Sequence, residues 1–139
     1  MSMNEPISVQ EALIYVMVIV SASDNQMTDN ELATIGDMIK MLPVFNGYDG
    51  NRIIPAAQRC GDILQEDNGL QLVLELVGDV LPAKLYDTAY ALGVEVAAAD
   101  LHVEKEELCI LQLLRDRFKL DKLTVAAIER GAIARHRTI

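Results

Sequence analysis

Acidic residues stand at the same spacing in two short stretches, and carboxylates arranged in this way could bind a cation. The first stretch, "SDNQMTDNEL", covers residues 23–32 and contains Asp24 and Glu31. The second, "ADLHVEKEEL", covers residues 99–108 and contains Asp100 and Glu107. In both stretches the Glu follows its Asp by seven positions. Carboxylate oxygens are the ligands that Ca²⁺ and Mg²⁺ prefer, so the four residues form a candidate metal site.

The same residues also suit the beginning of a helix. An EF-hand loop that starts at Asp24 would need Gly at its sixth position and Glu at its twelfth, where this chain has Asp29 and Ile35. Thr28 and Glu31 have the spacing of a capping box. One hypothesis is therefore that the acidic residues are caps and turn formers without a metal. The other is that the four carboxylates converge, and that a hard cation relieves their repulsion.

Helix signals run along the whole chain of 139 residues. They predict an all-α fold of about seven helices and no sheet. The first helix, after the capping box at Ser8 and Glu11, is apolar on every side and is expected to be buried. The other expected helices run from Thr28 to Pro43, over about 52–66 and 70–80, from Pro82 through Val96, over 104–118, and from Asp121 to near Arg135. Leu108, Leu111, Leu114 and Phe118 are expected on the apolar face of the sixth helix.

The chain contains an internal repeat. A shift of 76 residues places 18–42 over 94–118, with six of the 25 aligned positions identical. The repeat predicts two similar αα-hairpin halves within one domain, 1–139, that pack through their first helices. Four side chains are expected to be buried where those helices meet, namely Val16, Val20, Leu92 and Val96.

The repeated motif resembles that of the TerB-like domains of tellurite resistance. In that family an apolar helix ends in Ala and is followed by an Asp-Gly-x-hydrophobic turn, a polar cap and a Glu. Here the pattern reads "ASDNQMTDNE" at 22–31 and "AADLHVEKEE" at 98–107. The family's Gly is replaced by Asn25 and by Leu101, and because Leu adopts a left-handed backbone poorly, the second turn is expected to differ in shape. The resemblance implies an all-α domain of two halves, acidic turns that bind a divalent metal, and a link to oxyanion or other stress responses.

The composition of the chain limits the kinds of partner that it is expected to bind. A formal net charge of −9 opposes binding to nucleic acid, and the basic end "RHRTI" is interpreted as a helix terminus. The longest apolar run, 12–20, is about half of what a membrane span needs. Two distant cysteines and an N-terminus without a signal-peptide pattern predict a cytoplasmic protein. A protein partner and a homodimer are both expected.

Other reactive residue types receive structural interpretations. Cys60 and Cys109 are expected in the core, His102 in a turn, and His136 at a helix end. Glu95 is harder to assign to a solvated helix face, because it lies between two valines in a helix expected to be buried. No nucleophile is paired with a base, so no enzyme is predicted. The leading hypothesis is a cytoplasmic binding or adaptor module that responds to Ca²⁺ or Mg²⁺. The alternatives are a structural helical protein that dimerises without a metal site, and metal-assisted hydrolysis at the carboxylates.

Overall fold

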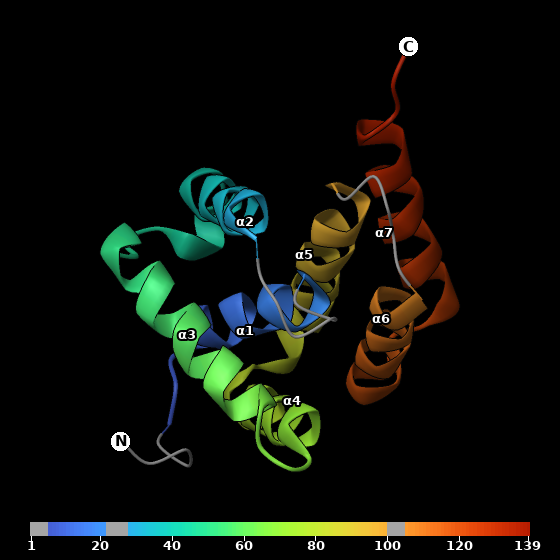
Figure 1. The fold of residues 1–139 in the computed structure, drawn as a ribbon. Helices are drawn as coiled ribbons and strands as arrows, with labels where there is room; N and C mark the ends of the chain where they lie inside the picture. The colour runs from blue at the N-terminus through green and yellow to red at the C-terminus, as the bar shows by residue number, and fades with distance from the viewer. Residues whose placement is uncertain (1–5, 22–27, 100–104) are drawn as a thin grey trace.

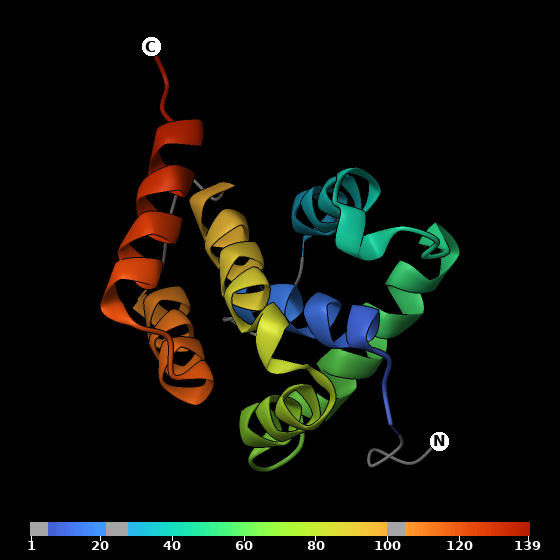
Figure 2. The same cartoon turned by 180° about the vertical axis from the view of Figure 1, so that it is seen from behind.

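The most apolar segment of the chain forms the central helix. The computed structural model of the protein describes residues 6–21, 28–99 and 105–139 (Figure 1). Helix α1, Val9–Ser21, is buried at every position from Ala12 to Ser21. It can be apolar on all sides because α3, α4 and α5 surround it (Figure 2).

The described residues contain seven α-helices and no strand, which confirms the predicted all-α fold class. After α1 come six further helices: α2 Asp29–Met41, α3 Ile53–Leu64, α4 Gly69–Val80, α5 Tyr86–Ala99, α6 Lys105–Phe118 and α7 Lys122–Arg135. Shifting α2 by 76 residues gives 105–117, which nearly coincides with α6. The helix bounds therefore follow the sequence repeat, while the equivalence of the two hairpins in space stays a prediction.

Helices α1 and α5 pack directly on each other, as the repeat predicted. A Cβ atom on Gly93 would lie 3.3 Å from Cγ2 of Val20, so the absence of a side chain at Gly93 lets the two helices approach closely. The four side chains predicted at this contact are all at most 5 % exposed, namely Val16, Val20, Leu92 and Val96. The contact between α1 and α5 is therefore a tightly packed part of the hydrophobic core.

The helix beginnings follow the expected capping chemistry. The Glu11 N–H donates to the Ser8 hydroxyl over 3.1 Å, and the Ser8 N–H donates to the Glu11 carboxylate over 3.0 Å. At α7, Asp121 accepts from both the backbone N–H and the hydroxyl of Thr124, at 2.8 and 2.9 Å. These bonds hold the pKa of Asp121 below its usual value. Each bond satisfies a backbone or side-chain donor that the first turn of a helix leaves without an intrahelical partner.

The fifth helix begins later than expected. Pro82 is extended, with ψ at 150°, and a 3₁₀ turn, Ala83–Leu85, separates it from α5. The Leu85 N–H donates to the Pro82 carbonyl over 2.9 Å and closes that turn. Two more 3₁₀ turns, Pro43–Phe45 and Gly50–Arg52, lie between α2 and α3.

The expected faces of α6 are partly wrong. Leu108 is 55 % exposed, and Cys109 is exposed rather than in the core, whereas Glu107 is only 3 % exposed. The buried face of α6 consists of Glu107, Ile110, Leu111, Leu114 and Phe118. Each helical residue turns by about 100°, so Glu107 falls near the centre of this face and Leu108 beyond its edge. The predicted face included only apolar residues, whereas the buried face of α6 continues through the carboxylate of Glu107.

Candidate functional site

The four predicted metal ligands fall into two groups. Asp24 and Asp100 lie outside the described residues, as does His102. Glu31 and Glu107 are described, and each occupies the first turn of its helix, α2 or α6. The spacing therefore placed both glutamates correctly along their helices.

Glu31 acts as a capping residue. Its Oε1 accepts from the Thr28 N–H over 2.9 Å, while the Glu31 N–H donates to the Thr28 hydroxyl over 3.1 Å. This reciprocal pair is the predicted capping box. The bond occupies one lone pair of the carboxylate, so the other oxygen remains chemically able to coordinate a cation.

Glu107 lies in a different environment, because α6 turns it toward the protein interior. The next turn of the same face carries Leu111, and a Cβ on Gly93 would meet both Leu111 and Val20 within 3.5 Å. Glu107 is thus on the face of α6 that packs toward α5 and the end of α1. Among the described residues, no group of three or more His, Cys, Asp or Glu side chains could hold a metal ion.

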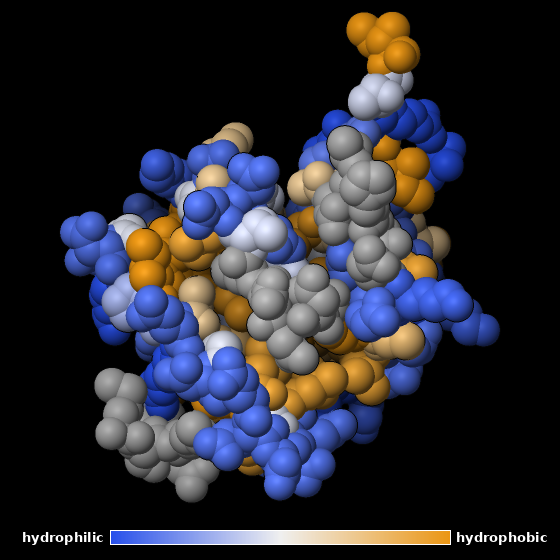
Figure 3. All heavy atoms as spheres, viewed as in Figure 1, coloured by the Kyte–Doolittle hydropathy of each residue, from blue (hydrophilic) through white to orange (hydrophobic). Residues whose placement is uncertain are grey.

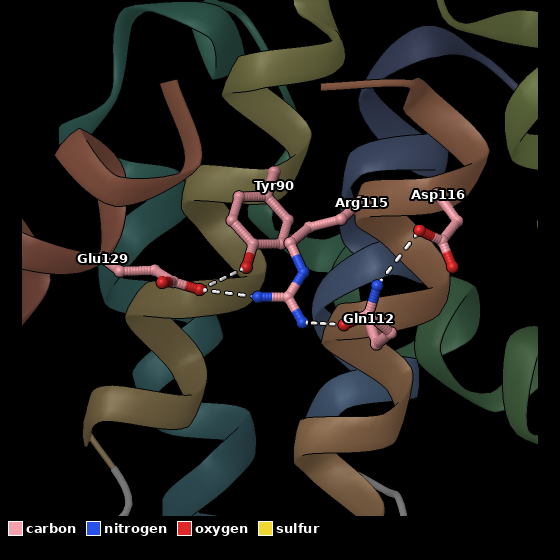
Figure 4. A network of polar contacts seen from close by, with 5 residues as sticks. All are labelled: Tyr90, Gln112, Arg115, Asp116 and Glu129. Carbon is pink, nitrogen blue, oxygen red and sulfur yellow. Dashed lines mark hydrogen bonds and ion pairs between the residues drawn. The ribbon is translucent and has the colours of Figure 1, made fainter. Parts of the chain in front are cut away.

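A second polar site joins α5, α6 and α7 (Figure 4). Oε2 of Glu129 accepts from the Tyr90 hydroxyl over 2.7 Å and from Nη1 of Arg115 over 3.1 Å. Gln112 extends the cluster on α6, because it accepts from Arg115 and donates to Asp116 over 3.0 Å.

The electrostatics of this cluster favour a structural role. Burial and the hydrogen bond to Glu129 both raise the pKa of Tyr90. The phenol therefore stays protonated and acts as a donor near neutral pH, and Arg115 neutralises the carboxylate that receives it. No spacing pattern in the sequence connects Tyr90, Arg115 and Glu129, although a Tyr in a helix expected to be buried does call for a partner for its hydroxyl.

Glu95 has a partner on the last turn of α7. One carboxylate oxygen pairs with Arg135, and Oε2 lies 2.8 Å from Nε2 of His136. The location of Glu95 between Val94 and Val96 is therefore explained by an ion pair across the α5–α7 contact. It also confirms that His136 is a helix-end residue, because His136 is the C-cap of α7.

The two cysteines differ in environment. Cys60 is fully buried on α3, and burial raises the pKa of its thiol well above the usual value. The thiolate is therefore scarce at neutral pH, which makes Cys60 a packing residue. Cys109 is exposed on α6.

The surface also carries a hollow of about 480 Å³ where α2 ends and α3 begins. Its walls include Ile39, Phe45, Tyr48 and Ile53. The Arg52 guanidinium lies 5.9 Å from the centre of the Tyr48 ring. On the face shown in Figure 3, hydrophilic side chains cover the outer surfaces of the helices and apolar side chains show between them.

In the part of the chain that the structure describes, the fold is all-α, acidic residues open α2 and α6 among other helices, and a polar junction joins α5, α6 and α7. No protein-family model, no curated protein and no solved structure matches the chain. No helix within the described ranges is long and apolar enough to cross a membrane.

Proposed function

We propose that the protein is a TerB-like binding or adaptor module whose acidic turns take a divalent cation, Ca²⁺ or Mg²⁺. In this proposal Asp24, Glu31, Asp100 and Glu107 supply the carboxylates, and cation binding presents the module to a protein partner. The resemblance of the repeated motif alone carries the link to tellurite or other stress resistance.

The burial of Glu107 carries the cation proposal. Glu107 brings a carboxylate to the inner face of α6, where a bound cation would be shielded from bulk water and attracted more strongly. Here α6 directs Glu107 toward the end of α1, and Asp24 follows Val20 of α1 by only four positions in the sequence. A hard cation with oxygen ligands suits such a pair of acidic segments.

Thermal melts with Ca²⁺, Mg²⁺ and Mn²⁺ test the proposal. A cation at 100 times its dissociation constant should stabilise the wild type by about 2.7 kcal/mol. Glu107→Gln, Asp24→Asn and Asp100→Asn each remove a charge at nearly constant size, so they should lose much of that gain. Glu106→Gln is the matched control, because Glu106 is exposed on the same turn of α6 and should keep the gain.

Two variants in the α2 cap separate capping from coordination. Thr28→Ala removes the N-cap and should cost about 1 kcal/mol with or without a cation. Glu31→Gln retains an oxygen for the capping box but loses its charge, so it should reduce only the stabilisation by the cation. A wild-type melting temperature that does not move at millimolar Ca²⁺, Mg²⁺ or Mn²⁺ would overturn the proposed cation site.

A structural helical protein without a metal is the second candidate. The hydrogen bonds between Thr28 and Glu31 favour it, because they account for a glutamate at this position by capping alone. In this case no cation stabilises the protein, and Asp24→Asn or Asp100→Asn leaves stability unchanged or raises it because repulsion is removed.

A further inference from the structure

Helix α7 packs on α5 but buries little apolar surface there. It lies along α5 at the edge of the fold (Figures 1 and 2). Ala132 is its only buried residue, and Val125 and Ile128 are half-buried beside it. Leu123, at 81 % exposure, and Ile133, at 51 %, face outward. Apolar burial alone therefore gives α7 a small share of the core.

Polar contacts supply the specificity of this attachment. Glu129 of α7 accepts hydrogen bonds from Tyr90 of α5 and Arg115 of α6. Glu95 of α5 forms an ion pair with Arg135 of α7. Residues 122–139 carry four Lys or Arg and one Glu, a formal charge of +3 in a chain of net charge −9. These contacts fix where α7 sits on α5 and α6, and the α7 of any copy of the chain could make them equally well.

The connection between α6 and α7 is short and strained. Lys119 adopts a left-handed backbone with φ at 52°, a conformation that a residue with a Cβ atom disfavours. Its N–H donates to the Asp116 carbonyl over 3.3 Å, and the Leu120 N–H donates to the Arg115 carbonyl over 3.2 Å, which ends α6 in a Schellman motif. Glycine usually occupies this position, but here neither Gly nor Pro lies between α6 and α7.

We propose that two copies of the chain exchange α7 and thereby form a homodimer. If Lys119 becomes helical, α6 and α7 join into one helix over 105–135, and α7 reaches the α5 of the second copy. Tyr90, Arg115 and Glu95 then bind Glu129 and Arg135 of the other chain through the same contacts as in the closed monomer. The two forms differ mainly at the hinge, where exchange releases the left-handed Lys119, and mass action decides between them. None of these residues belongs to the acidic turns, so the cation proposal and this one can fail separately.

The first test changes the hinge. Wild-type protein unfolded in urea and refolded at about 1 mM should give a dimer that dilution slowly converts to monomer, as mass action requires. Lys119→Gly removes the strain of the left-handed backbone in the closed monomer and weakens the continuous helix of the dimer. Because each dimer has two hinges, the association constant should fall by about 100-fold. Asn68→Gly is the matched control, because Asn68 is also left-handed but lies between α3 and α4. Protein that is monomeric after this treatment, or a dimer unaffected by Lys119→Gly, would overturn the proposal.

The second test uses complementation between copies. Arg115→Glu places two carboxylates together at this contact, and Glu129→Arg places two guanidinium groups together. After co-refolding, a mixture of the two variants should form a heterodimer in which both contacts are restored, at least about 10-fold in excess of either homodimer. The double variant Arg115→Glu/Glu129→Arg restores the contact within one chain and should behave as the wild type. A mixture with no preference for the heterodimer would show that α7 is not exchanged.

Discussion

The hydroxyls of Tyr15 and Tyr90 are both buried, but their surroundings differ. Tyr90 donates to Glu129, whereas the described residues offer no hydrogen-bond partner to the Tyr15 hydroxyl. Tyr90→Phe should therefore destabilise the protein by about 2 kcal/mol, because a hydrogen bond to a carboxylate is lost. Tyr15→Phe should be neutral or stabilising, because it removes an unpaired polar group at nearly the same shape.

Urea melts at neutral pH measure both changes. Tyr86→Phe is a useful control, because the stacking of Tyr86 on Phe118 at 4.9 Å does not need the hydroxyl. Equal losses for Tyr15→Phe and Tyr90→Phe would contradict this account of the two hydroxyls.

The same two tyrosines should make the protein sensitive to alkali. Burial raises the pKa of Tyr15 from 10.0 to about 12, and burial followed by the bond to Glu129 raises the pKa of Tyr90. Below pH 10 the phenols are neutral in both states, so their contribution to stability is complete there. Above pH 10, the unfolded chain releases protons that the folded chain retains. Each tyrosine therefore lowers the free energy of unfolding by about 1.4 kcal/mol per pH unit.

Urea melts between pH 8 and about 11.5 test this dependence, which spans the ordinary pKa of tyrosine. Tyr15→Phe should reduce the slope of stability against pH above pH 10, and Tyr15→Phe/Tyr90→Phe should reduce it further. An unchanged slope in the double variant would mean that other groups govern the alkaline transition.

At the scale of helices, Gly69 sets how closely α4 follows α3. A Cβ atom on Gly69 would lie 2.3 Å from the Ile63 carbonyl oxygen and 2.7 Å from the backbone of Leu64. Backbone atoms cannot move aside as a flexible side chain can, so Gly69→Ala should destabilise by about 2 kcal/mol or more.

The matched substitution is Gly36→Ala in α2, where an added Cβ meets nothing within 4 Å. There alanine should stabilise by roughly 0.5–1 kcal/mol, because it is the better helix former. Thermal melts of the two variants should therefore shift in opposite directions. A shift of the same sign in both would contradict the close approach at Gly69.

Local sequence was sufficient for the helices because their signals are local. The capping boxes at Ser8 and Thr28 and the cap at Asp121 lie at fixed offsets from the helices that they begin. The site around Glu129 could not be predicted in this way, because Tyr90, Arg115 and Glu129 come from three helices and no spacing pattern connects them. The buried side of α6 was misjudged for a different reason: the helical period places Glu107 on the same face as Leu111 and Phe118, but a carboxylate was not expected to be buried there.

At the scale of the whole molecule, α1 makes the fold a cooperative unit. It packs against α3, α4 and α5, so most of the apolar core shares one helix. Helix α7 contributes one buried residue, Ala132, and two half-buried ones, Val125 and Ile128, and polar contacts add to this packing. The molecule therefore combines a core that should unfold as a whole with a terminal helix that can leave it locally.

This difference between core and edge can be tested with one substitution at two places. Leu92→Ala truncates a side chain that is 3 % exposed on α5, at the α1 contact, and should cost about 2–5 kcal/mol depending on how far the site collapses. Leu123→Ala makes the same change on α7, where the side chain is 81 % exposed, and should stay within about 0.5 kcal/mol of the wild type. Urea melts measure the change in the free energy of unfolding of each variant, and amide hydrogen exchange shows which helices are destabilised. In Leu92→Ala, exchange through global unfolding should accelerate together in α1, α3, α4 and α5, because they share the weakened core. Faster exchange confined to α5 would mean that α1 does not couple these helices into one unit.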